Sequence, residues 1–242
     1  MIAEDVSALL LAAARNNADW CDAVSRAHGV PTVFAPAAWS GAARTPALYP
    51  DAVSLTPGAT AAEVLGGVDT ASPGCSVKDS FAALDLGPAG FEVLFEARWI
   101  HRPAGPAAAG GGDGGDGGPV WSRVRDAGEL ADWEAAWDEG EPSGLFRPEL
   151  ISPEVVFLAG RAGGRIVAGA VLSLGGGVVG VSNLFAPDPA GSDSAWAAAV
   201  GAAHELWPGL HVVGYEHGED LDAAVRAGFA PIGPLRVWLH TT

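Results

Sequence analysis

Basic residues are scarce in this chain, and lysine is nearly absent. Lys78 is the only lysine among 13 basic residues, which stand against 29 acidic ones and leave a formal net charge of -16. This charge would repel a polyanion such as DNA or RNA, and no basic stripe compensates for it. We therefore expect no nucleic-acid partner. The shortage of lysine and methionine beside abundant alanine, glycine and arginine is typical of GC-rich coding, which indicates a bacterial source.

Cysteine and long apolar runs are also missing. Cys21 and Cys75 are too few for a disulfide framework and form no CxxC motif, so we expect two reduced thiols of a cytosolic protein. The first residues carry acids where a secretory signal needs positive charge. No stretch approaches the roughly 20 apolar residues that cross a bilayer. These absences predict a cytoplasmic protein without a membrane partner and leave its oligomeric state open.

Common catalytic and metal-binding motifs are absent as well. The chain contains no GxSxG, HExxH or Walker pattern, and its six histidines share no metal-ligand spacing, so we expect no metal site. Hydrophobic residues make up 49% of the chain and charged residues 17%, which predicts a globular protein. A length of 242 residues suffices for one large domain or two small ones.

A glycine-rich stretch divides the chain. Residues 104–119, AGPAAAGGGDGGDGGP, impose little backbone preference and offer no side chain to bury, so we expect a flexible linker. The sequence therefore predicts an N-terminal domain over 1–103 and a C-terminal domain over 120–242.

The two halves end in the same way. Each closes with a polar strand end, a short Ala/Leu helix, a Gly-Phe pair and an Arg/Trp-bearing strand that ends in histidine; the pairs are Gly90-Phe91 and Gly228-Phe229. We interpret this as an internal repeat. The alternative is that two helix-to-strand connections share glycine as an ordinary C-cap.

Local patterns predict the elements of each half. In the first half we expect helices over 4–28 and 60–68, the latter with Thr60 as N-cap, a strand over 50–57 and an irregular stretch over 31–49. In the second half we expect strands over 121–126, within 155–185, over 211–216 and 234–240, and helices over 127–140, 195–205 and 220–227. Trp133 and Trp137 lie one turn apart and are interpreted as a core stripe, with a platform for a ligand as the alternative.

The order of elements over residues 155–242 is strand, tight turn, strand, glycine turn, strand, helix, strand, short helix, Gly-Phe and final strand. This order resembles the GNAT superfamily of acetyl-CoA-dependent N-acetyltransferases, in which a Gly-Phe pair commonly ends the last helix. The resemblance implies an α+β fold of two GNAT-like halves, the first more degenerate. Each half would be a mostly antiparallel, twisted mixed sheet flanked by helices.

The resemblance also implies a binding site for acetyl-CoA or another acyl-CoA in the C-terminal half. In the family the fourth strand binds the pantetheine arm through its backbone, and Asn183, Leu184 and Phe185 end the corresponding strand. The phosphates rest on an Arg-Gly-x-Gly turn before the next helix, where this chain has Gly191, Ser192, Asp193 and Ser194. No arginine is present in that turn, and ordinary N-capping by Ser192 or Asp193 is the alternative.

Catalytic groups are expected at the end of the fifth strand. The family's usual tyrosine acid falls on Ala224, and its asparagine on His217. Tyr215, Glu216 and His217 lie where such folds open their cleft, and a Glu or His there would take a proton from an amine. The alternative is a solvated strand end. On the first helix, Asn16 and Trp20 would either line a pocket between the halves or form a polar packing edge.

Three functions are compatible with these observations. The first is an acyl-CoA-dependent N-acyltransferase, in which a small amine attacks the thioester directly. The second is a GNAT-derived binding or regulatory protein without CoA. The third is a GNAT fold recruited to a different reaction on a small metabolite.

Overall fold

The computed structural model describes residues 6–71, 73–105, 118–140 and 142–241, so most of the expected linker 104–119 lies outside the described residues. The α-helices are α1 (Val6–Ala27), α2 (Ala61–Leu65), α3 (Ala127–Trp137), α4 (Pro189–Leu206) and α5 (Gly218–Arg226). Two short 3-10 helices are η1 (Gly87–Ala89) and η2 (Pro148–Leu150). The strands are β1 (Thr32–Phe34), β2 (Ala38–Gly41), β3 (Ala52–Ser54), β4 (Ser76–Asp79), β5 (Phe91–Arg102), β6 (Val120–Arg123), β7 (Val155–Ala162), β8 (Arg165–Gly175), β9 (Val178–Phe185), β10 (Val212–Glu216) and β11 (Ala230–His240).

These strands form one continuous 11-stranded sheet in the order β1-β2-β3-β4-β11-β5-β10-β9-β8-β7-β6. The expected α+β class with a mostly antiparallel sheet flanked by helices is confirmed. The expected separation into two sheets differs from the structure, because the halves exchange their last strands. Strand β11 lies between β4 and β5, while β5 lies between β11 and β10.

Both halves use the same sequence of pairings. Strands β1, β2 and β3 pair antiparallel and β3 pairs parallel with β4; likewise β7, β8 and β9 pair antiparallel and β9 pairs parallel with β10. Each parallel pair is connected through a helix, α2 or α4, as a parallel connection requires. This shared order agrees with an internal repeat, and the descent of both halves from one unit stays a prediction.

Strand alternation assigns the helices that pack on β7 to opposite faces of the sheet. Val155, Phe157 and Ala159 of β7 pack into a core with α1 and α3. Val156 and Leu158 of the same strand pack into a second core with α4 and α5. Successive side chains of a strand point to opposite faces of the sheet, so β7 is buried on both faces. This explains why its sequence is a continuous apolar run.

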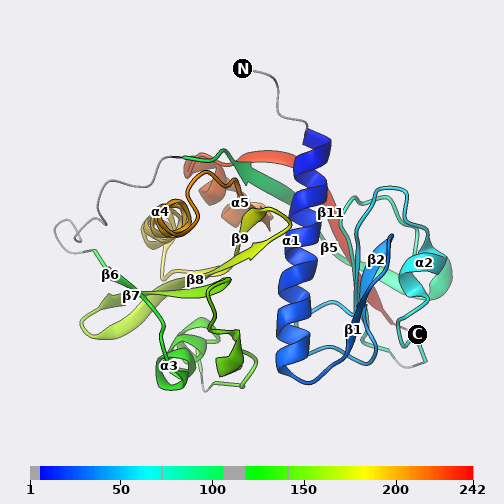
Figure 1. Ribbon diagram of the computed structural model, residues 1–242, viewed down its shortest axis with the longest axis horizontal. Helices are drawn as coiled ribbons and strands as arrows, with labels where there is room; N and C mark the ends of the chain where they lie inside the picture. The colour runs from blue at the N-terminus through cyan, green and yellow to red at the C-terminus, as the bar shows by residue number, and fades with distance from the viewer. Residues whose placement is uncertain (1–5, 72, 106–117, 141, 242) are drawn as a thin grey trace.

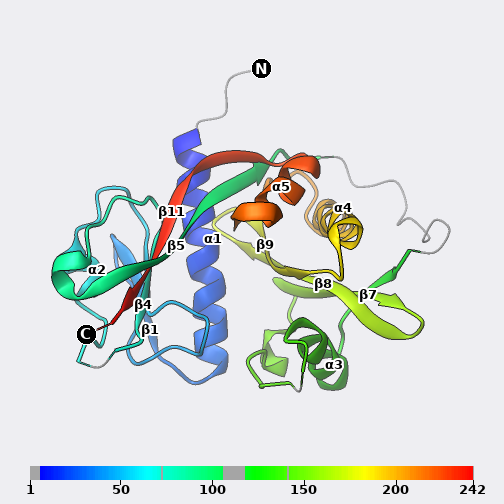
Figure 2. The ribbon, with the colours of Figure 1, turned by 180° about the vertical axis from the view of Figure 1, so that it is seen from behind.

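Helix α1 joins the two halves. It runs across the middle of the molecule, between the N-terminal strands and β7–β9 (Figures 1 and 2), and packs on β8, β9 and β11. Its Asn16 amide donates to the backbone oxygens of Ser173, Gly175 and Val178 at 2.9, 3.2 and 3.4 Å. These bonds anchor the helix to the β8–β9 hairpin.

Most expected elements are present, with three informative differences. The short Ala/Leu helix expected before Gly90-Phe91 does not form: residues 80–86 are turn and irregular backbone, and only the 3-10 helix η1 precedes the pair. Thr60 caps α2 with a full capping box, as expected. The stretch 31–49 was expected to be irregular but contains β1 and β2, whose three and four residues are too short for a period-two pattern. Helix α4 begins at Pro189, before the expected residue 195, because Asp188 caps it and proline is well suited to the first helical position.

Of the two tryptophans on α3, Trp133 belongs to the core, as expected. Its side chain is fully buried, and its indole N–H donates to the Leu158 backbone oxygen at 2.7 Å. Trp137 is only partly buried and reaches a cavity described below. Over the described ranges, no helix is long and apolar enough to cross a bilayer.

Candidate functional site

The sheet opens between β9 and β10. These parallel strands pair only at Val179 with Val212 and at Gly180 with Val213. Beyond these pairs the strand ends separate, and a cavity of about 240 Å³ lies at the opening. Its walls come from α1, the β2–β3 connection, β4, α3, β9 and β10; they are Asn17, Trp20, Cys21, Leu48, Tyr49, Pro50, Lys78, Trp137, Val181, Ser182, Asn183, Leu184, Tyr215 and Glu216. Both halves therefore build one cavity.

A β-bulge shapes the β9 side of this cavity. The register with β8 shifts between the pairs Gly169–Phe185 and Val171–Ser182, which leaves an extra residue on β9. Asn183 lies in the bulge with φ of 50°, a left-handed conformation that asparagine tolerates better than most residues. Bulges of this kind commonly redirect the backbone beside functional sites. Nearby, the Ser182 hydroxyl is buried and has no hydrogen-bond partner among the described residues.

Lys78 crosses from the N-terminal half into the cavity wall. Its side chain is buried, and its ammonium donates to the Asn17 Oδ1 atom at 2.9 Å and the Tyr215 hydroxyl at 3.0 Å. The ammonium also lies 4.3 Å from the Tyr215 ring centroid, within cation–π range. Desolvation by burial acts to lower the pKa of Lys78, but the charges of Tyr215 and Cys21 in their ionised forms, together with the hydrogen bond to Tyr215, outweigh it, so the pKa is raised. Lys78 is thus a cation within the cavity wall.

Cys21 is not prepared as a nucleophile. Burial raises the pKa of its thiol to about 11, despite the opposing attraction of Lys78. A thiol with this pKa is almost entirely protonated near neutral pH, and the thiolate is the reactive form. Its contact with the Asn17 Oδ1 atom at 3.9 Å instead makes it part of the cavity wall.

Glu216 is the cavity's candidate base. Burial raises the pKa of its carboxyl to about 8, and the negative charge of Asp220 acts in the same direction. A group with this pKa exchanges a proton near neutral pH, which suits general acid–base chemistry. Its neighbour Tyr215 accepts a hydrogen bond from Lys78, so the phenolic proton of Tyr215 is available to another acceptor.

The expected site residues divide into two groups. Asn183, Leu184, Tyr215 and Glu216 come together around the cavity. Phe185 lies outside its lining and packs edge-on against Trp133. His217 is exposed, precedes α5 as its N-cap residue and has its ring centroid 5.5 Å from that of Phe95. Two of the three expected catalytic residues therefore share the cavity, and the third lies apart.

The expected phosphate-binding turn also lies outside the cavity lining and has a different local structure. Gly191, Ser192, Asp193 and Ser194 belong to the first turns of α4. The Asp188 carboxylate accepts the Gly191 backbone N–H at 2.8 Å, and thus takes a donor that a phosphate would use. Asp193 pairs with Arg226 at 2.9 Å. An ordinary N-cap therefore accounts for this helix end, but the capping residue is Asp188 and not Ser192 or Asp193, which the alternative named.

Only part of this cavity was predictable from the sequence. Trp20 lines it, as the pocket interpretation of the first helix predicted, whereas Asn16 lies outside the lining and bonds the β8–β9 hairpin; its neighbour Asn17 lines the cavity instead. Lys78 and Tyr49 were not identified as site residues. The only lysine of a strongly acidic chain was a usable signal for Lys78. For Tyr49, an irregular stretch without periodicity gave no such signal.

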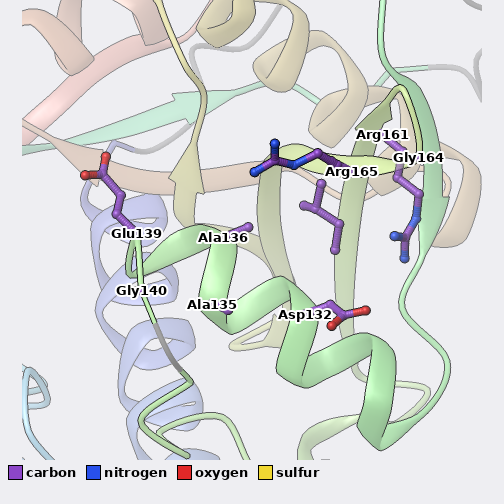
Figure 3. Close-up of a pocket in the computed structure, with 9 residues that line it drawn as sticks. Asp132, Ala135, Ala136, Glu139, Gly140, Arg161, Gly164 and Arg165 are labelled. Carbon is purple, nitrogen blue, oxygen red and sulfur yellow. The ribbon is translucent and has the colours of Figure 1, made fainter.

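A second hollow, of about 630 Å³, lies between α3 and the β7–β8 hairpin. Figure 3 shows Arg161 and Arg165 extending from the hairpin, with Asp132 on α3 below and Glu139 after the end of that helix. Arg165, Asp132 and Glu139 are exposed, and Arg161 pairs with Glu129 at 3.8 Å. Exposed charges of both signs are typical of a solvated surface, so the cavity at the sheet opening is the stronger candidate. Over the described ranges, no three His, Cys, Asp or Glu side chains are grouped to hold a metal ion.

No family model and no curated protein sequence matches the chain. Solved structures do. A GCN5-related N-acetyltransferase from Kribbella flavida has a TM-score of 0.62 at 14% identity, over 99% of this chain and 97% of its own. An acetyltransferase from Novosphingobium aromaticivorans, described as putative and as a member of the GNAT family, has a TM-score of 0.58 at 15% identity, over 94% and 98%. Because both matches span almost the full length of both chains, the likeness includes the N-terminal half. The chain therefore has the fold of the GCN5-related N-acetyltransferases.

Proposed function

We propose that the protein is an acyl-CoA-dependent N-acyltransferase that acts on a small amine at the opening between β9 and β10. The observation that carries the proposal is the cavity itself. It combines a strand opening, a bulge at Asn183 and a carboxyl group, Glu216, whose pKa is about 8. An acyl-CoA supplies the acyl group as a thioester.

The cavity fits the acyl end of such a donor. Past the last β9–β10 pair the two strands no longer pair with each other, and we expect an extended arm to bond their facing edges by strand addition. The buried Ser182 hydroxyl offers a further bond. The α4 N-terminus fits the phosphates less well, because Asp188 occupies the Gly191 N–H. We therefore expect donor binding that depends mainly on the acyl and pantetheine end.

Glu216 and Tyr215 divide the proton transfers. The Glu216 carboxylate takes a proton from the acceptor ammonium, so the neutral amine can attack the carbonyl carbon. As the C–N bond forms and the C–S bond breaks, the Tyr215 hydroxyl gives its proton to the departing sulfur. The amide nitrogen releases a second proton, which restores Tyr215, and the reaction releases one proton overall. Alignment of amine and thioester in the small cavity supplies much of the rate enhancement.

Calorimetry with acetyl-CoA and free CoA, followed by a thiol-release assay with a panel of primary amines, tests this proposal. We expect heat from acetyl-CoA and amine-dependent thiol release that Glu216→Gln lowers by about 10²-fold or more. The matched control is Glu219→Gln, which changes an exposed carboxylate on α5. Absence of both donor binding and thiol release at millimolar acetyl-CoA would contradict the proposal.

A second function is favoured by one observation, the carboxylate of Asp188 at the α4 N-terminus. In that case the protein would be a GNAT-derived binding or regulatory module without CoA. The same calorimetry on Asp188→Asn separates the two. If neither the wild type nor this variant binds acetyl-CoA while small amines still bind, the binding module is the better assignment.

A further inference from the structure

We propose that the ligand of the cavity is a small amine that also carries a carboxylate, as an amino acid does, and that Lys78 binds this carboxylate. The inference rests on the proposed function for the role of the amine, and it goes further by naming the substrate class. Its evidence is the unmatched charge of Lys78 and the hydroxyl groups around it whose protons have no acceptor among the described residues.

Lys78 lacks a counter-charge. Its ammonium has three N–H donors, and the described residues supply two neutral acceptors, Asn17 and Tyr215. No described carboxylate forms an ion pair with it, although the chain carries 29 acidic residues. A buried charge without an opposite charge is costly, so this arrangement favours an anion from outside the protein. The third N–H of Lys78 remains for that anion.

Two further donors line the same cavity. The Ser182 hydroxyl is buried and has no hydrogen-bond partner within the described part of the chain. The Tyr49 hydroxyl is buried beside the Trp20 indole N–H, which can only donate, so the Tyr49 proton has no acceptor there. Buried polar groups are nearly always bonded, and a carboxylate accepts several hydrogen bonds. Together with Lys78, these hydroxyls form a donor set suited to an anionic group.

The rest of the cavity fits the remainder of an amino acid. Glu216 provides a carboxyl group for the amine, and Trp20 and Trp137 provide aromatic walls for an apolar side chain. The volume of about 240 Å³ lies below the range of drug-sized pockets, which suits a small metabolite. A ligand with a carboxylate, an amine and an apolar side chain satisfies all three parts.

The test compares amino acids with their amides, which keep the shape and the amine but lose the carboxylate charge. Calorimetry and thermal shift would use L-phenylalanine, L-leucine and L-methionine, each against its amide, without donor. We expect at least one acid to bind about tenfold or more tightly than its amide, as a hydrogen-bonded charge predicts. Lys78→Met should abolish this preference, and Lys78→Arg should retain part of it.

Several outcomes would overturn the inference. These are equal binding of acids and amides, failure of every acid to bind at 10 mM (roughly the weakest affinity such a site would give), or an unchanged preference in Lys78→Met. The wild-type comparison stands even if Lys78→Met does not fold. The proposed function fails separately. If acids bind and acetyl-CoA neither binds nor transfers, the carboxylate site remains and the acyltransferase does not; if amides are acylated as well as acids, only the carboxylate site is wrong.

Discussion

Replacing Glu216 by glutamine tests the electrostatics of the cavity without reference to any substrate. The native carboxyl has a pKa of about 8, raised from its ordinary value of 4.5 first by burial and then by Asp220. The folded protein therefore holds a proton that the unfolded chain loses above pH 4.5. By linkage, the free energy of unfolding falls as the pH rises from about 4.5 to about 8, and then levels off. Glutamine resembles the neutral acid and removes this loss.

The expected magnitude follows from the same pKa. A tenfold change in proton affinity is worth about 1.4 kcal/mol, so an upper bound on the loss is about 5 kcal/mol. The side chain is only half-buried, and contact with water reduces the effect to about 2–3 kcal/mol. For a chain of this length, that corresponds to a difference of about 5–10 °C in Tm.

Thermal unfolding at pH 5 and pH 9 measures the effect. We expect Glu216→Gln and the wild type to unfold at similar temperatures at pH 5, and the variant to be more stable by the stated amount at pH 9. Glu219→Gln, which alters an exposed carboxylate on the neighbouring helix α5, should show no such growth with pH. A constant difference between variant and wild type across this range would refute the assigned pKa, and with it the role of Glu216 as a base near neutral pH.

Three further predictions concern other parts of the structure. Asp188→Asn keeps a capping side chain but removes a negative charge from the α4 N-terminus, so calorimetry should show acetyl-CoA binding several-fold tighter, by about 0.3–1 kcal/mol. The control Asp126→Asn, at the equivalent cap of α3, should leave the acetyl-CoA affinity unchanged. Tyr215→Phe should lower kcat for thiol release by about 10²-fold with little change in the KM for the donor, and an unchanged kcat would exclude Tyr215 as the acid. Asn16→Ala removes three bonds to the β8–β9 hairpin and should cost about 1–3 kcal/mol in urea unfolding, whereas a neutral effect would contradict its anchoring role.

The order of elements in the C-terminal half was predictable because its patterns are strong and local. Apolar runs separated by glycine turns predicted β7, β8 and β9, and the alternation of helix and strand after them predicted the rest. The start of α4 was placed too late, because the proline-rich segment looked like a break while Pro189 in fact occupies the first helical position after Asp188. Local chemistry was sufficient here, and only its interpretation was wrong.

The continuous sheet could not be predicted in the same way. The ends of the two halves, with Gly90-Phe91 and Gly228-Phe229, have similar sequences, and each last strand pairs antiparallel with a strand of the other half. Tertiary packing decides which half each last strand joins, and local sequence patterns do not report on tertiary packing. The same limit applies to Lys78 and Tyr215, which lie 137 residues apart and meet only once the strands have been exchanged.

The geometry of this meeting explains why the cavity needs both halves. Lys78 on β4 and Tyr215 on β10 are separated by two intervening strands, β11 and β5, so their backbones are about three strand spacings, or roughly 14 Å, apart along the sheet. Only long side chains that reach toward each other can close such a gap, and a lysine and a tyrosine do so at 3.0 Å. Shorter residues at either position would leave the charge of Lys78 or the hydroxyl of Tyr215 out of reach. The N-terminal half therefore supplies the cation and the C-terminal half supplies the proposed acid–base pair, so the chemistry proposed for the cavity depends on the shared sheet.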